Sequence, residues 1–216
     1  MIYQLPRGPL TAFPPVDEAD EDGLLAIDGT LSVHNLVLAY KGGVFPWPSE
    51  GLPLLWFAPP RRGVLDFKNL HVPSRLKREL KKMTFELKIN SAFKEVMSAC
   101  AQVKNRKNQK GTWITPDLIE AYQQLHEAGF ALSFEAWEEG KLVGGMYGVW
   151  LKPFFAGESL FFKKTGASKY CLLQAIEWLK TQGTDWMDIQ MVTPLLKSFG
   201  AKEISRNEYM KRLKFK

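Results

Sequence analysis

Apolar residues recur at helical spacing in two segments of the C-terminal half of the chain. The first, TPDLIEAYQQLHEAG, begins at Thr115, has Pro116 in the first helical position and places Gly129 just past its last turn. The second, residues 168–183, has Ser168 as its expected N-cap, and its apolar residues fall on one face. Both segments are therefore predicted to be amphipathic helices that pack one face against a core.

The residues between and after these helices have the pattern of strands. Residues 131–162 contain three apolar runs separated by turn signals at Glu139-Gly140 and Lys152-Pro153, which predicts an antiparallel meander. A short strand, WMDIQM, follows the second helix, and a helical stretch ends the chain. The predicted order is three strands, helix, strand and helix.

The N-terminal half has a mixed pattern. Residues 32–43 predict a helix with Ser32 as N-cap and a glycine pair at its end. Residues 61–110 predict a short strand, a helix capped by Ser74, a second strand FELKI, and a helix that begins near Ser91.

We therefore predict an α+β fold with a small N-terminal α/β domain and a C-terminal domain built on an antiparallel-rich mixed sheet. The expected divisions are an N-terminal region with an aromatic loop over 1–62, a basic segment over 63–110 that completes the N-terminal domain, and the C-terminal domain over 111–216.

The segment from Val44 to Pro60, VFPWPSEGLPLLWFAPP, fits neither a helix nor a strand. Five prolines and four aromatic residues share it, and prolines fix the backbone and remove hydrogen-bond donors. Such a loop either plugs a core or lines a site. A large aromatic residue such as Trp47, taken alone, is typical of core packing.

The net charge of +6 is concentrated in one block. Residues 61–110 carry 14 basic and 4 acidic side chains, whereas residues 1–60 carry 2 and 7. The helix from Ser74 places Arg75, Arg78 and Lys82 on one side, and a second cluster, KNRKNQK, has the polarity of a loop. Two basic clusters in one block indicate a polyanionic partner, and the alternative is a merely solvated face.

Several classes of function have no support in the chain. No glycine-rich phosphate loop is present, the three histidines have no metal-ligand spacing, and two cysteines are too few for a disulfide framework or a cysteine zinc site. We expect no metal and no cofactor. No signal segment or run of about 18 apolar residues is found, so a cytoplasmic protein with no membrane partner is expected.

The strand WMDIQM carries the most distinctive polar pair. Asp188 and Gln190 are two residues apart and would emerge on the same face of a strand, with Met187 and Ile189 on the other. A carboxylate beside a carboxamide can hold an acceptor and a donor in fixed geometry, as an active site requires. The alternative is a strand with one solvated face.

A series of motifs along most of the chain resembles the leucyl/phenylalanyl-tRNA-protein transferase family. In order from residue 23 to about residue 201, they are GLLAIDGTLS, AYKGGVFPW, GTWIT, EAYQQLHEAGFALSFEAW, LVGGMYGV, GESLF and DIQ. The resemblance implies an enzyme that moves Leu or Phe, with Met as a further candidate, from aminoacyl-tRNA to a protein with N-terminal Lys or Arg. This reaction creates a bacterial N-degron. The resemblance also implies a GNAT-like C-terminal domain. We expect the protein to be a monomer.

The same resemblance assigns roles to individual residues. Asp188 would orient Gln190, whose amide oxygen would accept a hydrogen bond from the attacking amine, and Glu158 would bind the acceptor's Lys or Arg. The residues expected around the aminoacyl group and the terminal adenosine are Trp47, Trp113, Met146, Leu160 and Ala175. The residues expected to contact tRNA are Arg75, Arg78, Lys81, Lys82 and Lys107.

The chain departs from the family pattern at three places. MVTPLLKSFGA follows Gln190 in place of a polar stretch with His, Ala175 stands where relatives can carry an aromatic residue, and a longer tail is absent after RLKFK. These differences leave the donor preference among Leu, Phe and Met open. The alternative functions are a GNAT-like transferase that builds peptidoglycan bridges from aminoacyl-tRNA and a non-catalytic tRNA-binding protein. An acetyl-CoA enzyme is disfavoured because FKKTGAS lacks the pyrophosphate-loop signature.

Overall fold

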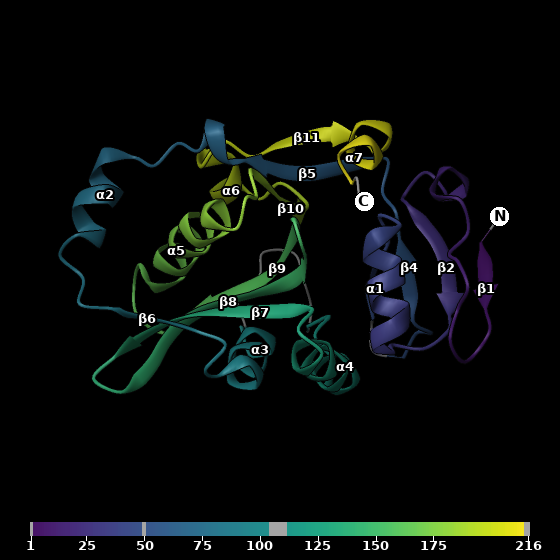
Figure 1. Cartoon of the computed structure of the whole chain (residues 1–216), viewed down its shortest axis with the longest axis horizontal. Coiled ribbons are helices and arrows are strands. Elements are labelled where there is room, and N and C mark those ends of the chain that lie inside the picture. The colour runs from purple at the N-terminus through teal and green to yellow at the C-terminus, as the bar shows by residue number, and fades with distance from the viewer. Residues whose placement is uncertain (1, 49–50, 104–111, 214–216) are drawn as a thin grey trace.

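The computed structural model describes residues 2–48, 51–103 and 112–213, and the strands of these residues form two sheets (Figure 1). The small sheet has the order β1-β2-β4-β3, with β1 Tyr3–Leu5, β2 Leu24–Asp28, β3 Phe45–Pro46 and β4 Leu55–Phe57. The large sheet has the order β11-β5-β10-β9-β8-β7-β6, with β5 Arg61–Asp66, β6 Glu86–Ile89, β7 Ala131–Glu138, β8 Lys141–Leu151, β9 Phe154–Phe162, β10 Trp186–Gln190 and β11 Lys202–Ser205. The helices are α1 Val33–Lys41, α2 Ser74–Leu80, α3 Phe93–Ala101, α4 Pro116–Glu127, α5 Ala167–Thr181, α6 Pro194–Ser198 and α7 Arg206–Arg212.

The large sheet confirms the predicted α+β fold and its antiparallel meander. Strands β7, β8 and β9 pair antiparallel in sequence order, α5 follows, and β10 then returns parallel to β9. Helices α3 and α4 lie on one face of this sheet and α5 lies on the other (Figure 1). The apolar faces of these helices are buried, so the sheet has a core on both sides.

The small sheet packs around Trp56, which is fully buried and donates its indole N–H to the carbonyl of Asp28 at 2.8 Å. Helix α1 begins as predicted, because the Ser32 hydroxyl accepts a hydrogen bond from the amide of Asn35 at 3.2 Å. It ends at Gly42, and Gly43 adopts a left-handed conformation with φ of 78°. The chain leaves this turn directly into β3 and the aromatic loop.

Residues 63–110, expected to complete the N-terminal domain, contribute strands to the large sheet. Strands β5 and β6 pair within the large sheet, β5 with β10 and β11, and β6 with β7. Helix α3 packs on the same sheet. The sequence pattern identified these elements as strands and a helix, but it carried no information about which distant strands they pair with.

Two predicted helix caps also differ. Helix α5 is preceded by Gly166, not capped by Ser168, and Gly166 has a left-handed φ of 88°. This left-handed conformation favours glycine, and a Cβ here would also require the end of the Met83 side chain, 2.4 Å away, to move. Helix α2 begins at Ser74 with Pro73 at the N-cap position. Proline fixes the backbone there, and the serine is already helical.

A buried carboxylate joins the large sheet to the start of α3. Glu135 on β7 is fully buried, and its Oε1 accepts hydrogen bonds from the amides of Ser91 and Ala92, at 2.9 and 2.8 Å, and from the Ser133 hydroxyl at 2.7 Å. Its Oε2 accepts the indole N–H of Trp137 at 3.1 Å. The negative charge therefore faces the positive end of the helix and satisfies donors that would otherwise be buried without partners.

We expect Glu135→Gln to lower the free energy of unfolding by about 1–3 kcal/mol, because the amide group offers a weaker acceptor and places a donor against other donors. Urea denaturation followed by circular dichroism measures the change. Glu139→Gln, an exposed position in the β7–β8 turn, is the control and should stay within about 0.5 kcal/mol of the wild type. Equal changes in the two variants would contradict the role of Glu135.

Candidate active site

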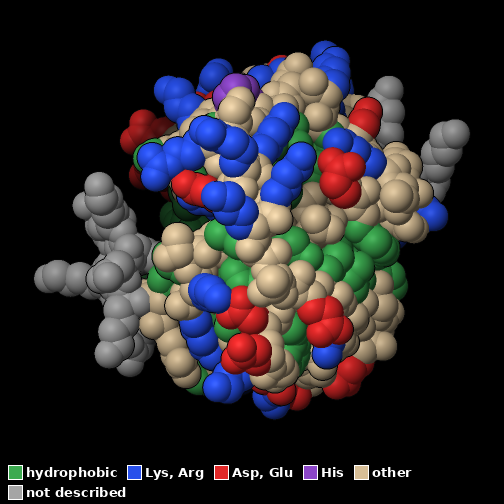
Figure 2. Space-filling view, turned by 90° about the vertical axis from the view of Figure 1, so that its left-hand side faces the viewer, with side chains coloured by type: hydrophobic (Ala, Val, Ile, Leu, Met, Phe, Trp, Pro, Cys, Tyr) green, Lys and Arg blue, Asp and Glu red, His purple; other side chains and the backbone are tan. Residues whose placement is uncertain are grey.

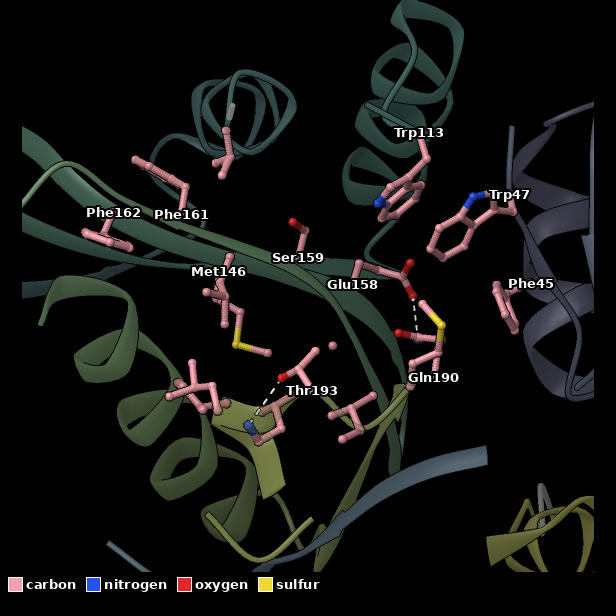
Figure 3. A pocket seen from close by; sticks show the side chains of 18 of the residues that line it. Phe45, Trp47, Trp113, Met146, Glu158, Ser159, Phe161, Phe162, Gln190 and Thr193 are labelled. Carbon is pink, nitrogen blue, oxygen red and sulfur yellow. Dashed lines mark hydrogen bonds between the residues drawn. The ribbon is translucent and has the colours of Figure 1, made fainter. Parts of the chain in front are cut away.

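A cavity of about 940 Å³ lies between the aromatic segment of the small sheet and strands β9 and β10 of the large sheet (Figure 3). Its walls differ in chemistry from side to side. The aromatic wall consists of Phe45, Trp47 and Trp113, the aliphatic wall includes Met146, Leu160 and Leu172, and the polar floor carries Glu158 and Gln190.

The aromatic wall brings together two segments that are far apart in the sequence. The rings of Trp47 and Trp113 are stacked, with their centroids 5.0 Å apart and their planes at 19°. Phe45 meets Trp47 edge to face at 6.3 Å. The amide of Trp47 donates to the carbonyl of Leu55 at 2.8 Å, which anchors the segment to β4. Two flat rings are thus presented to the cavity by fixed backbone.

The aliphatic wall is formed where the meander meets α5. Met146 on β8 and Leu160 on β9 are paired residues in the sheet, and both line the cavity. Gly157 leaves room for Met146, because a Cβ at Gly157 would lie 2.7 Å from the Cε atom of Met146. Ala175 does not line the cavity. It is buried one helical turn beyond Leu172, which does.

Bulges in the two central strands direct the polar side chains. In the pairing of β8 with β9, Tyr147 faces Ser159 and Gly148 faces Gly157, so Glu158 is the extra residue of a bulge. In the pairing of β10 with β5, the register shifts between Asp188 and Gln190. Bulges re-aim side chains, and here they turn Glu158 and Gln190 towards the same cavity.

Glu158 is the acidic group on the polar floor. Its Oε1 accepts the Tyr40 hydroxyl at 2.7 Å and the side-chain amide of Gln190 at 3.2 Å, and the Tyr40 and Tyr122 hydroxyls are 2.6 Å apart. Burial raises the pKa of Glu158 to about 8; the hydrogen bond from Tyr40 opposes the rise and Asp188 adds to it. The carboxyl group therefore changes charge near neutral pH.

Gln190 reaches the cavity from a left-handed backbone. Its φ is 51°, which is unusual for a residue other than glycine, and its amide donates to Oδ1 of Asp188 at 2.9 Å. Asp188 itself is fully buried and does not line the cavity. The sequence pattern placed both side chains on one face of a strand, but the bulge separates them. Asp188 contacts the backbone of Gln190, not its side-chain amide.

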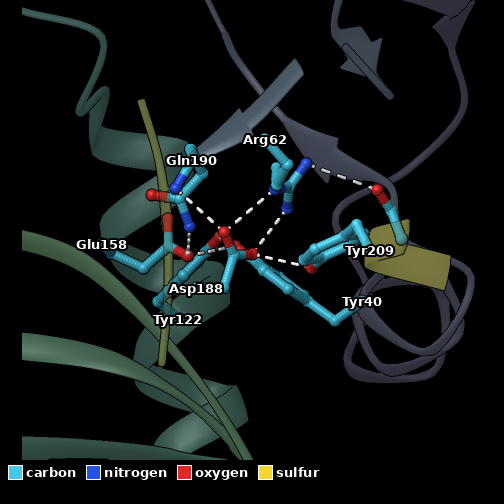
Figure 4. Close-up of polar contacts among 8 residues, drawn as sticks. Tyr40, Arg62, Tyr122, Glu158, Asp188, Gln190 and Tyr209 are labelled. Atoms are coloured by element: carbon cyan, nitrogen blue, oxygen red, sulfur yellow. Dashed lines mark hydrogen bonds and ion pairs between the residues drawn. The ribbon is translucent and has the colours of Figure 1, made fainter. Parts of the chain in front are cut away.

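Asp188 pairs with a buried arginine that the sequence did not single out. Arg62 on β5 donates to both carboxylate oxygens, from Nε at 2.9 Å and from Nη2 at 2.7 Å, and the Tyr209 hydroxyl of α7 donates at 2.8 Å (Figure 4). Burial opposes the charge on Arg62, but the carboxylate of Asp188 outweighs burial and raises the pKa of Arg62. Arg62 therefore stays protonated in the folded protein.

Signals for these buried polar residues are weak in the sequence. Arg62 stands next to Arg61, which is exposed, and nothing in RRGVLDF distinguishes the two. The one usable signal is that Arg62 directly precedes an apolar run, where a charged residue needs a partner if the strand is buried. Tyr40, Tyr122 and Tyr209 are spaced as ordinary core residues of helices.

The basic residues lie on a different part of the surface. Arg78, Lys81 and Lys82 are exposed on and just after α2, and Arg75 is exposed but paired with Glu79 at 2.8 Å. Figure 2 shows Lys and Arg side chains gathered over the upper part of the face on which α2 lies. Lys107 lies outside the described residues.

Metal clusters and membrane-spanning helices are both absent from residues 2–48, 51–103 and 112–213. Within these ranges, no group of three or more His, Cys, Asp or Glu side chains is placed to hold a metal ion. None of the helices there is both long and apolar enough to span a bilayer.

The raised pKa of Glu158 predicts a pH dependence of stability. The folded protein holds this proton to about pH 8 and the unfolded chain only to about pH 4.5, so the contribution of Glu158 to stability is lost as the pH rises between these values. We expect Glu158→Gln to gain stability relative to the wild type from about pH 5 to about pH 9. Urea titrations across this range measure it.

Glu138→Gln is the matched control. Lys164 lowers the pKa of Glu138, so this group is ionised in both folded and unfolded states above about pH 6. Its substitution should shift stability by the same amount at every pH in that range. If the change in the free energy of unfolding caused by Glu158→Gln were also the same at every pH, the assignment of the raised pKa would be contradicted.

The family models and the sequence relatives agree on one family. A family model described as leucyl/phenylalanyl-tRNA protein transferase matches residues 64–214, and one for the N-terminal domain of that family matches residues 29–60. The leucyl/phenylalanyl-tRNA--protein transferase of Flavobacterium johnsoniae is 47% identical over 204 residues, which is 94% of this chain and 96% of the relative. That of Anaeromyxobacter dehalogenans strain 2CP-C is 44% identical over 212 residues, 98% of this chain and 90% of the relative.

Among solved structures, L-PGS from Bacillus licheniformis is similar over 78% of this chain and 55% of its own, with a TM-score of 0.43 and 14% identity. That likeness is too low to add to the assignment, which the sequence relatives and the family models establish by themselves. The chain belongs to the leucyl/phenylalanyl-tRNA-protein transferase family.

Proposed function

We propose that this protein transfers Leu or Phe from aminoacyl-tRNA to the α-amino group of proteins that begin with Lys or Arg. The observation that supports this most is the cavity itself, in which stacked aromatic rings, an aliphatic wall and a polar floor with a carboxyl group meet. The names of the relatives support the aminoacyl-tRNA donor and the protein acceptor. We place the protein in the cytoplasm, as a monomer that marks its acceptors as N-degrons.

The reaction needs positioning more than strong acid or base chemistry. An aminoacyl ester is already activated, so the acceptor amine attacks the ester carbonyl, an amide bond forms, and the ribose oxygen of the tRNA leaves. An α-amino group has a pKa of about 8, so roughly a tenth of it is neutral at pH 7. Holding the amine beside the carbonyl then supplies much of the acceleration.

The donor fits the aromatic and aliphatic walls. Trp47 and Trp113 both line the cavity and would offer ring surface for stacking of the terminal adenine. Stacking of this kind accepts any base, because every base has a π-face. Met146 and Leu160 would contact the Leu or Phe side chain. Ala175 would act from behind Leu172 by setting how far that residue can recede, which bears on the preference among Leu, Phe and Met.

The acceptor fits the polar floor. The Glu158 carboxyl is directed at the space beside the two tryptophan rings (Figure 3), where an ionised carboxylate would bind the ammonium or guanidinium group of the acceptor's first residue. The amide oxygen of Gln190 would accept a hydrogen bond from the α-amine. Asp188 would contribute through the backbone of Gln190, since its side chain is buried.

The competing functions differ in what they require of this cavity. A non-catalytic tRNA-binding protein would leave Asp188 and Gln190 satisfied away from any cleft, yet Gln190 lines the cavity. A transferase for peptidoglycan bridges would use the same donor with a cell-wall precursor as acceptor. The acceptor assay below distinguishes it from the proposed function.

We expect the protein, given Leu- or Phe-charged tRNA, to add one residue to peptides with N-terminal Arg or Lys, measured by mass spectrometry. A peptide with N-terminal citrulline, which is shaped like arginine but neutral, should react at least about tenfold less efficiently, because it cannot form the charge-assisted hydrogen bond. In Glu158→Gln this difference should shrink, whereas in Glu138→Gln it should persist. No transfer to any peptide rejects the function, and an unchanged Arg-to-citrulline ratio in Glu158→Gln rejects the role of Glu158.

We expect tRNA affinity to depend steeply on salt, because Arg78, Lys81 and Lys82 would neutralise phosphates and release counterions. Replacing all three with Gln should reduce the slope of log affinity against log salt by up to about 0.9 for each phosphate that is no longer neutralised. Filter binding with charged tRNA measures the slope. The control replaces three exposed lysines elsewhere, Lys141, Lys152 and Lys180. If the α2 variant and the control showed the same slope of log affinity against log salt, this surface would be excluded as the tRNA-binding surface.

A further inference from the structure

Arg62 is a buried cation on β5 that contacts three other parts of the chain. Besides the two bonds to Asp188, its Nη1 donates to the carbonyl of Gly43 at 3.4 Å, and its guanidinium lies over the ring of Phe45 at 4.3 Å and over that of Tyr209 at 4.6 Å. The side chain is only 2% exposed. It therefore connects the start of the aromatic segment, β5, β10 and α7 through a single planar group (Figure 4).

Both carboxylate oxygens of Asp188 are occupied by donors from the protein. Oδ1 accepts the Nε–H of Arg62 and the amide N–H of Gln190, and Oδ2 accepts the Nη2–H of Arg62 and the hydroxyl of Tyr209. A carboxylate offers about four lone-pair positions, so all of them are used within the protein. Asp188 therefore influences the cavity indirectly, by fixing the groups that donate hydrogen bonds to it.

The group it holds towards the cavity is the backbone of Gln190. The left-handed φ of 51° at Gln190 carries a conformational cost, and it persists only where the surroundings fix it. The bond from the Gln190 amide to Asp188 is one restraint. Gly63 permits the close approach of this backbone to β5, because a Cβ there would lie 2.9 Å from the carbonyl carbon of Met191, the residue that follows Gln190.

The same guanidinium restrains the opposite wall. Gly43 and Phe45 precede Trp47 by only a few residues, and Phe45 also contacts the Trp47 ring. The bond to Gly43 and the stacking on Phe45 tie this segment to β5. Arg62 thus sets the separation between the wall proposed to bind the donor and the residue proposed to bind the attacking amine.

We propose that Arg62 is a positioning residue for aminoacyl transfer: through Asp188 it holds Gln190, and through Gly43 and Phe45 it holds the aromatic wall. This inference rests on the proposed function for its kinetic consequence. The requirement for arginine is geometric. Two parallel N–H donors, a third donor and two flat faces are all used, and lysine supplies none of these arrangements.

Arg62→Lys tests the proposal because it keeps the positive charge. We expect kcat to fall about 100-fold, as for a misplacement of about 1 Å, while KM for charged tRNA stays within about threefold of the wild type. Tyr209→Phe, which removes one of the four donors to Asp188, should give a smaller fall in kcat. Arg61→Lys is the matched control, because Arg61 is the exposed neighbour on the same strand, and it should leave both constants unchanged.

A second pair of variants separates positioning from stability. Arg62→Met combined with Asp188→Leu replaces the buried charges with apolar groups and should recover the stability that either single substitution loses. We expect kcat to stay low in this double variant. If kcat recovers together with stability, or if Arg62→Lys keeps the wild-type kcat, the proposal is overturned.

Amide hydrogen exchange gives a measurement that needs no substrate. The Gln190 amide should be protected in the wild type and in Arg61→Lys, and it should lose protection in Arg62→Lys while amides of β7 and β8 keep theirs. Unchanged protection at Gln190 would overturn the proposal. Absence of transfer by the wild type would instead reject the proposed function, and the exchange result would still decide whether Arg62 holds Gln190.

Discussion

The buried ion pair between Arg62 and Asp188 is the interaction on which the arrangement of the site depends. Two charges removed from water are stabilised only if their remaining donors and acceptors are also satisfied. Here the Gln190 amide on β10 is joined by partners from the aromatic segment and from α7. The aromatic segment, β5, β10 and α7 must therefore all be in place for the pair to be tolerated. A core of apolar residues would impose no comparable requirement on their relative positions, because apolar contacts are not directional.

The cavity opens beside the point at which β9 and β10 pair. The two strands are paired only at Asp188 and Ala156, and each departs from its regular ladder within the next few residues. Just beyond this pairing, Glu158 on β9 and Gln190 on β10 line the cavity and are joined by a hydrogen bond. The bonds from Arg62 to Asp188 tie β10 to β5 at the pairing itself.

The sequence predicted the regular parts of the fold better than the parts that carry the site. Thr115 caps α4 and Gly129 ends it as expected, because capping depends on residues close together in the chain. The family motifs identified Trp47, Trp113, Met146, Leu160, Glu158 and Gln190, all of which line one cavity. The pattern could not show that Asp188 faces inward, because one bulge breaks the period of two on which that expectation depended. Arg62 was missed because its partner is 126 residues away.

In the proposed reaction, the raised pKa of Glu158 would connect the choice of acceptor with the uptake and release of a proton. A cationic acceptor side chain would favour the ionised carboxylate, so its arrival would lower the pKa of Glu158 and release a proton from the floor of the cavity. By linkage, ionisation of Glu158 would strengthen binding of that acceptor to the same extent. A neutral acceptor would leave Glu158 protonated. At higher pH the carboxylate would have to form in a buried position with no cation beside it to offset the loss of hydration. Selectivity for a basic first residue would then arise because Glu158 is costly to ionise unless that residue is bound. Such a carboxyl group would discriminate more strongly between acceptors than an exposed carboxylate that is always ionised.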